Sequence, residues 1–362
     1  MQLIRFLRQR GKRLPLRVYL RGLVTWRPLT EPEAGYSVVM GCMRSLWRIA
    51  TANLRLIDSQ RLANLHEVIL VFDCLEHEIP EGVRRVVAKL NVPCRIVCYT
   101  QRQARRARLI DWGWVYCWLS WAIGVGEAKT RHVLLHDLDA LPLHPDLFET
   151  LYDNARATRK AFTGVSHYQG GDINRGMELA ATYEMVLDAT VLRERFRPIE
   201  LFNRERFVDG RCVDYDTFLE VQSRVGSSAV TPVDESWLVH PSQMICQYVD
   251  LKAGRTGFTR GEHNLPILSY YFTLGGDGAD MSAAGAGLAD PSERAVPLFG
   301  QRVEIDGISP KRWAWMEKQI RRVEQRLHVQ TRPNVERFLA GIAARAGDAR
   351  TVGREAGGVD AV

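Results

Sequence analysis

The sequence lacks several features that would place it in a specialised class of protein. No apolar run is long enough to cross a bilayer, and the first residues lack the apolar central stretch of a secretory signal. None of the seven cysteines forms a CxxC pair, so a zinc site or a disulfide framework is not indicated. With 46% hydrophobic and 25% charged residues and no internal repeat, the 362-residue chain is expected to be a folded, cytoplasmic protein.

Acidic residues are absent from the first 30 positions, whereas basic residues are frequent there. Two interpretations of this basic leader, residues 1–33, remain open. It could form an amphipathic helix that contacts an anionic membrane at the inner face, or a poorly ordered arm that wraps the domain. Nucleic acid is not an expected partner, because the sequence has neither a basic recognition helix nor an aromatic RNA-binding signature. The basic residues before Glu31 are Arg5, Arg8, Arg10, Lys12, Arg13, Arg17, Arg21 and Arg27.

Predicted strands and helices alternate along the next hundred residues. Buried, β-branched runs predict the strands, and apolar residues at helical spacing predict the helices between them. This alternation indicates an α/β fold with a mainly parallel central sheet, whose ligands bind beyond the carboxyl ends of the strands. The predicted strands are 36–42, 67–73, 94–100 and 132–139, and the most apolar predicted helix is 112–126.

The pattern is looser after residue 150. We expect a strand at 160–168 and helices at 178–196 and 214–226. The Gly/Ala-rich segment 271–300 is expected to be a flexible loop that could close over a site. Beyond it we expect a helical extension at 301–339, with its main helix at 311–328, and a disordered tail at 340–362.

The most informative motif is LLHDLDALPLHPDLF, residues 134–148. An apolar strand delivers Asp137 and Asp139, which are separated by one residue and would share a face of a regular strand. Two carboxylates held so close repel one another unless a cation or protons intervene. A divalent ion that prefers oxygen ligands, Mn²⁺ or Mg²⁺, would remove that repulsion and leave positions open for diphosphate oxygens.

A strand followed by DxD, a small residue and a proline resembles the signature of GT-A glycosyltransferases, especially the large family two, which includes many bacterial enzymes. The order of elements over residues 36–250 follows that family. The resemblance implies a GT-A fold with C-terminal helical additions. The catalytic domain would cover 34–270, with a nucleotide-binding half at 34–145 and an acceptor half at 146–270.

The resemblance also implies roles for individual residues. An acidic residue at the end of the second strand, here Asp73, holds the base or ribose in that family. The family's catalytic base opens a helix after an acidic pair; VDYDTFLEVQSRVG places Asp214 there, although Val213 departs from the pattern and leaves Asp216 as the alternative base. A histidine beyond that helix is often the third metal ligand, which points to His240, with His263 as runner-up. For the aspartates the competing interpretation is a helix cap or a carboxylate at a helix N-terminus, and for the histidines it is a structural role.

Two further side chains are candidates for binding the nucleotide sugar, together with Asp137. Arg105 belongs to a basic cluster after the third strand, and a guanidinium suits a diphosphate. Trp237 could stack on a sugar. Solvent exposure for Arg105 and a place in the core for Trp237 are the alternatives.

The reaction implied is transfer of a sugar from a nucleoside diphosphate donor to a hydroxyl, an inverting, metal-dependent, hexosyltransferase-like activity (EC 2.4). The acceptor would be a glycan, a lipid-linked molecule or a small molecule. Two alternatives remain at this stage. The chain could be a non-catalytic nucleotide-sugar-binding protein of the same fold, or a sugar nucleotidyltransferase, although MGCMRSLWR is a poor version of that class's phosphate loop.

Overall fold

The structure is a computed structural model of the whole chain. It describes residues 1–170, 178–241, 244–255, 270–271, 274, 278–290, 292–305, 307–328 and 330–355. His263, the runner-up metal ligand, lies outside the described residues. The chain divides into two compact units. One holds most of residues 1–237, and the other holds residues from Leu238 on together with Arg48–Leu56 and Leu141–Leu143.

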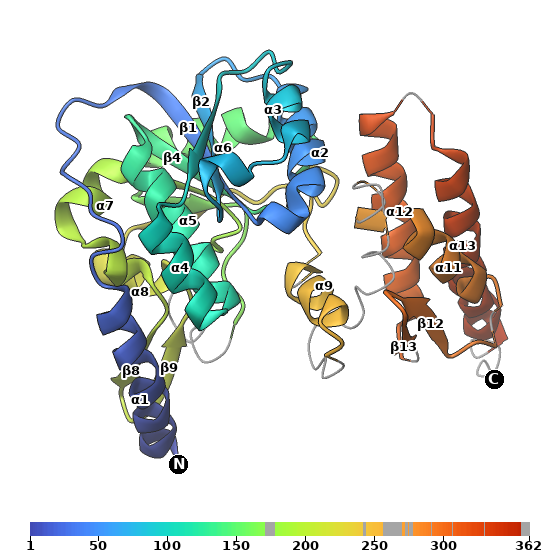
Figure 1. Ribbon diagram of the computed structural model, residues 1–362. Helices are drawn as coiled ribbons and strands as arrows, with labels where there is room; N and C mark the ends of the chain where they lie inside the picture. Colours follow the sequence, from blue (N-terminus) through green and yellow to red (C-terminus); the bar gives the residue numbers. More distant parts are fainter. Residues whose placement is uncertain are drawn as a thin grey trace, which may run out of the picture. The chain divides into compact units, whose positions relative to one another are not determined.

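A seven-stranded sheet forms the centre of the first unit (Figure 1). Its strand order is β10-β6-β7-β4-β1-β2-β3, and every pairing is parallel except those of β7 with β4 and β6. The expected mainly parallel central sheet flanked by helices is therefore confirmed. Its strands are β1 (Glu33–Cys42), β2 (Leu65–Phe72), β3 (Cys94–Cys98), β4 (Thr130–His136), β6 (Phe162–Gly164), β7 (Glu184–Asp188) and β10 (Ser228–Val230).

Helix α5 (Gly113–Glu127) packs directly against the middle of this sheet. Most of its side chains are buried, which explains its almost uncharged sequence. A Cβ atom built at Gly124 would lie 2.2 Å from a methyl carbon of Val39 on β1, so this close packing requires glycine. The other helices of the first unit are α1 (Gln2–Leu20), α3 (Glu81–Val87), α4 (Gln101–Ile110), α6 (Leu147–Thr158), α7 (Ala189–Arg195) and α8 (Leu219–Val225), whereas most of α2 (Trp47–Asp58) belongs to the second unit.

The predicted helix at 178–196 is wrong for its first half. Residues 184–188 form β7, which lies between β4 and β6 and has every side chain buried. Asp188 then ends the strand, and its carboxylate accepts hydrogen bonds from the backbone N–H groups of Thr190 and Val191. This N-cap explains why helix α7 begins only at Ala189.

The predicted helix at 214–226 also begins later than expected. Residues up to Tyr215 belong to a hairpin of β8 (Arg204–Val208) and β9 (Arg211–Tyr215), and α8 begins only at Leu219. Both turn residues, Asp209 and Gly210, have positive φ, at 48° and 76°. Asp-Gly is the pair that favours such a two-residue turn, so the local sequence fixes this hairpin.

The second unit is mainly helical. Helices α11 (Gly278–Leu288) and α12 (Pro310–Leu327) pack against α13 (Pro333–Glu355), and a hairpin of β12 (Ala295–Leu298) and β13 (Gln301–Glu304) packs beside α11. The main helix expected at 311–328 is confirmed as α12. Helix α9 (Met244–Lys252) and the short ribbon of β5 (Leu141–Pro142) with β11 (Leu238–Val239) complete this part of the chain.

The predictions of a flexible loop at 271–300 and a disordered tail from 340 are wrong where the structure describes those residues. The small residues form helices instead, because they allow α11 and α13 to approach closely. A Cβ at Gly341 would lie 3.0 Å from the Cβ of Leu288, and Ile342 is fully buried. A Gly/Ala-rich composition here reflects close helix packing rather than disorder.

Candidate metal centre and active site

Asp137 and Asp139 follow β4 directly and lie in a tight turn. The backbone N–H of Asp137 donates to the carbonyl of Tyr183 (2.9 Å), and the N–H of Ala140 donates to the carbonyl of Asp137 (3.1 Å). Asp139 is only 5% exposed, whereas Asp137 is partly exposed. The preceding residue, His136, is fully buried, and its Nδ1 lies 2.6 Å from Oε2 of Glu184 on β7. The strand therefore anchors the turn that presents both aspartates.

Strand pairing brings His240 to the same turn. Strands β5 and β11 are antiparallel, with Val239 opposite Leu141, so His240 and Ala140 are the next residues along the ribbon. One ligand atom each from Asp137, Asp139 and His240 lies within 4.8 Å of the others. The three residues predicted as metal ligands are therefore close together in the structure.

The donor set of this cluster fits a divalent cation. Two carboxylates and one imidazole offer oxygen and nitrogen ligands, which suit first-row divalent ions and, for the carboxylates, Mg²⁺ as well. Asp137 and His240 are both partly exposed, so a bound ion would remain accessible to a ligand from solvent. The chain thus contains a metal-binding type of site at the carboxyl end of β4.

Asp73 lies at the same edge of the sheet, because β2 and β4 are the two parallel neighbours of β1. One of its carboxylate oxygens accepts a hydrogen bond from the backbone N–H of Arg44 (2.7 Å). Burial raises the pKa of Asp73, while that hydrogen bond and the charge of Arg108 lower it. One oxygen of this carboxylate is therefore already hydrogen-bonded to the backbone at the start of the turn after β1.

The second DxD pair of the chain, Asp214 and Asp216, is held differently. Asp214 lies on strand β9, not at the start of a helix as predicted. Its carboxylate accepts two hydrogen bonds from the Arg13 guanidinium. Nη2 donates to Oδ2 (3.1 Å), and Nη1 donates to Oδ1. Arg13 comes from helix α1, is 3% exposed, and also lies 3.9 Å from Glu205. The charge of the Asp214 carboxylate is thus neutralised by the Arg13 guanidinium.

Asp216 follows the strand and is partly exposed. It accepts hydrogen bonds from the side-chain amide of Asn203 (2.7 Å) and from the N–H of Thr217 (2.7 Å). Burial raises the pKa of Asp216; the two hydrogen bonds lower it, and the charges of Asp214 and Asp137 add to the increase. The carboxylates of Asp216 and Asp137 therefore interact electrostatically.

Helix α1 supports this segment through residues that the sequence analysis did not identify. The Arg17 guanidinium donates to the carbonyls of Phe202 (2.9 Å) and Asn203 (3.3 Å). Asn203 in turn holds Asp216, and its side-chain oxygen accepts from the hydroxyl of Thr217 (2.7 Å). The two Arg17 contacts join residues 185 and 186 positions apart, so no local signal in the sequence could have indicated them.

The two remaining candidates differ in their surroundings. Arg105 is exposed on α4, where the neighbouring Arg108 pairs with Glu78 (3.2 Å). Trp237 stacks face to face on His144, with ring centroids 3.7 Å apart and planes inclined by 5°. The N–H of His144 also donates to the carbonyl of Trp237 (3.1 Å). Trp237, three residues before His240, therefore has one face of its ring covered by His144.

No family model matches the chain, and no curated protein matches its sequence. The solved structures to which it is similar include the galactosyltransferase LgtC in complex with donor and acceptor sugar analogues, at 10% identity and a TM-score of 0.40, over 55% of this chain and 74% of that chain. A 4-diphosphocytidyl-2C-methyl-D-erythritol synthase from Anaerococcus prevotii is similar at 14% identity and a TM-score of 0.36, over 61% and 96%.

A third similar structure is the glucosyl-3-phosphoglycerate synthase from Mycobacterium tuberculosis in complex with Mn²⁺, uridine diphosphate and glucosyl-3-phosphoglycerate. It shares 12% identity at a TM-score of 0.35, over 60% of this chain and 75% of that chain. All three likenesses are remote in sequence and partial in length.

Proposed function

We propose that this protein is a glycosyltransferase that moves a sugar from a nucleoside diphosphate donor to an acceptor hydroxyl with inversion. The observation that carries the proposal is the cluster of Asp137, Asp139 and His240 at the carboxyl edge of the sheet. Ligands of parallel α/β sheets bind at this edge, and a nucleotide diphosphate carries the negative charge that a metal there would attract.

Asp137, Asp139 and His240 would hold the ion, Mn²⁺ or Mg²⁺. When bound, such an ion supplies Lewis-acid stabilisation to the negative charge of a departing diphosphate. Asp73, at the end of β2, would accept hydrogen bonds from the donor's base or ribose with the oxygen that Arg44 leaves available. Trp237 would offer its second ring face to the sugar, and Arg105 would contact the diphosphate.

Asp216 is the residue that we assign as general base, in preference to Asp214. A base has to accept a proton from the acceptor hydroxyl, and it does so best when its pKa is raised toward the working pH. Burial provides that increase for Asp216, and Asn203 fixes the orientation of its carboxylate. Asp214 is already neutralised by Arg13, so its lone pairs are directed at a guanidinium rather than at a substrate.

The test is a panel of nucleoside diphosphate sugars, screened with Mn²⁺ and with Mg²⁺ by thermal shift and by release of the nucleoside diphosphate. We expect one donor to stabilise the protein only when the metal is present, and to be hydrolysed slowly without an acceptor. Asp139→Asn should abolish both effects. Arg105→Gln serves as the matched surface variant on the nucleotide side, with a smaller loss confined to donor affinity.

The same panel separates the two alternatives. A sugar nucleotidyltransferase would consume a nucleoside triphosphate and a sugar phosphate and release pyrophosphate. A binding protein without activity would show the metal-dependent thermal shift but no release of nucleoside diphosphate with any acceptor. Either result would replace the proposed transfer reaction.

A further inference from the structure

Helix α1 presents two different faces. Its inner face packs on β8 and β9 (Figure 1). There, the ring of Phe6 lies 5.6 Å from that of Phe207, and Arg13 and Leu20 are buried. Its outer face carries large aliphatic side chains that are 49–71% exposed. These residues, which we call the outer stripe, are Leu3, Ile4, Leu7, Leu14 and Val18.

The outer stripe follows helical geometry. Ile4, Leu7, Leu14 and Val18 are separated by three, seven and four residues, so their side chains project from the same side of the helix. Contiguous exposed aliphatic side chains on a soluble domain mark a surface that binds something apolar. A helix that served only to cover β8 and β9 would carry polar residues on this side.

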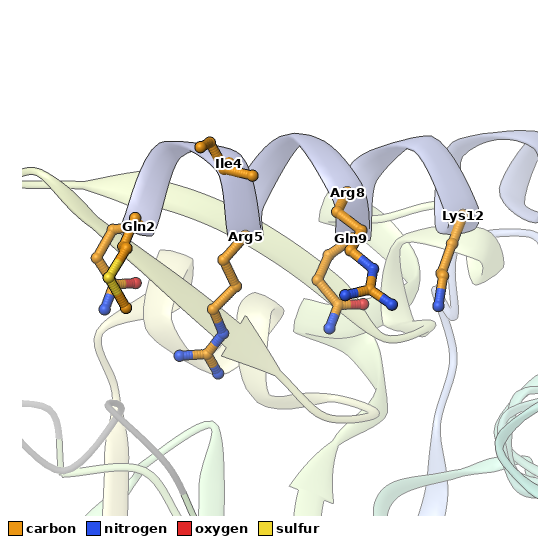
Figure 2. Close-up of a pocket in the computed structure, with 7 residues that line it drawn as sticks. Gln2, Ile4, Arg5, Arg8, Gln9 and Lys12 are labelled. Carbon is orange, nitrogen blue, oxygen red and sulfur yellow. The ribbon is translucent and has the colours of Figure 1, made fainter.

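Cations flank the outer stripe. Arg5, Arg8, Arg10 and Lys12 are all exposed, and the first acidic residue of the chain is Glu31. A shallow hollow of about 620 Å³ runs along one side of the helix. Figure 2 shows Ile4 directed away from the side on which Arg5, Gln9 and Lys12 project. The residues that line the hollow are Met1, Gln2, Ile4, Arg5, Arg8, Gln9 and Lys12.

We propose that α1 docks on an anionic phospholipid bilayer. The outer stripe would enter the boundary between headgroups and acyl chains, and the long arginine and lysine side chains beside it would reach lipid phosphates. Charge selects this occupant over a second copy of the chain. Two α1 helices packed along their stripes would bring two all-basic segments together, whereas an anionic bilayer neutralises them.

Vesicle co-sedimentation with the full chain tests this proposal. We expect the protein to sediment with vesicles of phosphatidylglycerol and phosphatidylcholine, to remain in solution with phosphatidylcholine alone, and to be released by added salt. The double variant Leu7→Glu, Val18→Glu should weaken the binding by at least roughly tenfold, because it places two charges in the apolar face. Circular dichroism would show that the helix and its fold are retained.

The control is Leu109→Glu. Leu109 is 70% exposed on helix α4, outside the outer stripe, and should change nothing. Equal loss of binding in the control, or no binding to anionic vesicles by the unchanged protein, overturns the proposal. So does a dimer in size-exclusion chromatography that the double variant converts to a monomer, which would make a second copy the occupant. If the double variant binds anionic vesicles as well as the unchanged protein does, the attraction comes from charge alone. That result would also overturn the proposal.

Discussion

The chain contains two DxD pairs, and their surroundings give the identical spacing different chemistry. Asp137 and Asp139 follow a strand in the middle of the sheet and meet His240, with ligand atoms within 4.8 Å of one another. Asp214 lies on a hairpin strand and Asp216 follows it; Arg13 binds the first carboxylate and Asn203 binds the second. Spacing alone therefore does not define a metal site; the side chains that surround the pair decide.

Removing one carboxylate of the first pair should have the largest effect. Asp139→Asn leaves two of three ligands, so Mn²⁺ affinity should fall below detection and the transfer rate should drop on the order of 10³-fold, or ~4 kcal/mol of transition-state stabilisation. Calorimetric metal titration and a donor-turnover assay measure the two effects. Full turnover in this variant would remove the metal from the mechanism.

The second pair should affect the rate without affecting metal binding. Asp216→Asn removes the base and should lower kcat by about 10²- to 10⁴-fold while Mn²⁺ affinity stays unchanged. The base works only when deprotonated, so the activity of the unchanged protein should fall as the pH drops through the pKa of Asp216, which burial raises above its ordinary value. This acidic limb should be missing from the pH profile of the residual activity of Asp216→Asn. A limb that persists in the variant would assign it to another group.

His240→Ala tests whether the imidazole belongs to the first pair. Loss of a ligand that contacts the ion should weaken Mn²⁺ binding by at least roughly tenfold. That is already the usual cost of losing a residue that only hydrogen-bonds to a metal ligand. His144→Ala is the matched control, since His144 stacks on Trp237 and is not part of the cluster. Equal metal affinity in both variants would exclude His240 as a ligand.

The smallest effect is expected at Asp214. Because Arg13 already neutralises this carboxylate, Asp214→Asn should change kcat by less than about threefold and leave metal affinity intact. Its main consequence should be a lower melting temperature, because buried Arg13 would keep, among the described residues, Glu205 at 3.9 Å as its acidic partner. A loss of kcat as large as that of Asp216→Asn would reverse the assignment of the base.

Residues whose structure depends on local patterns were predicted well from the sequence. Strands β1, β2 and β4 are largely buried apolar runs between turns, and β3 is a half-buried apolar run at the edge of the sheet, so the sequence pattern alone identifies all four. Because strand β4 was predicted correctly, Asp137 and Asp139 could be recognised as a pair of carboxylates directly after it. His240 was predicted only through the resemblance, and the β5–β11 ribbon is what brings it to them.

The errors occurred where distant contacts or unrecognised turns decide the structure. Residues 184–188 contain good helix formers but become a strand, because β4 and β6 pair with both of its edges and all five residues are buried. The hairpin at Asp209–Gly210 did have a local signal, the Asp-Gly pair, which the helical reading of 214–226 overlooked. The Arg13–Asp214 contact spans 201 positions, and nothing in either local segment indicates the other.

The most direct test is Mn²⁺ titration, followed by electron paramagnetic resonance, of the unchanged protein and of two matched variants. Asp139→Asn and Asp214→Asn each remove one carboxylate charge from a DxD pair. The structure predicts that the first loses the bound-Mn²⁺ signal and the second retains it at the affinity of the unchanged protein. Equal retention or equal loss in the two variants would contradict a metal centre at the end of β4.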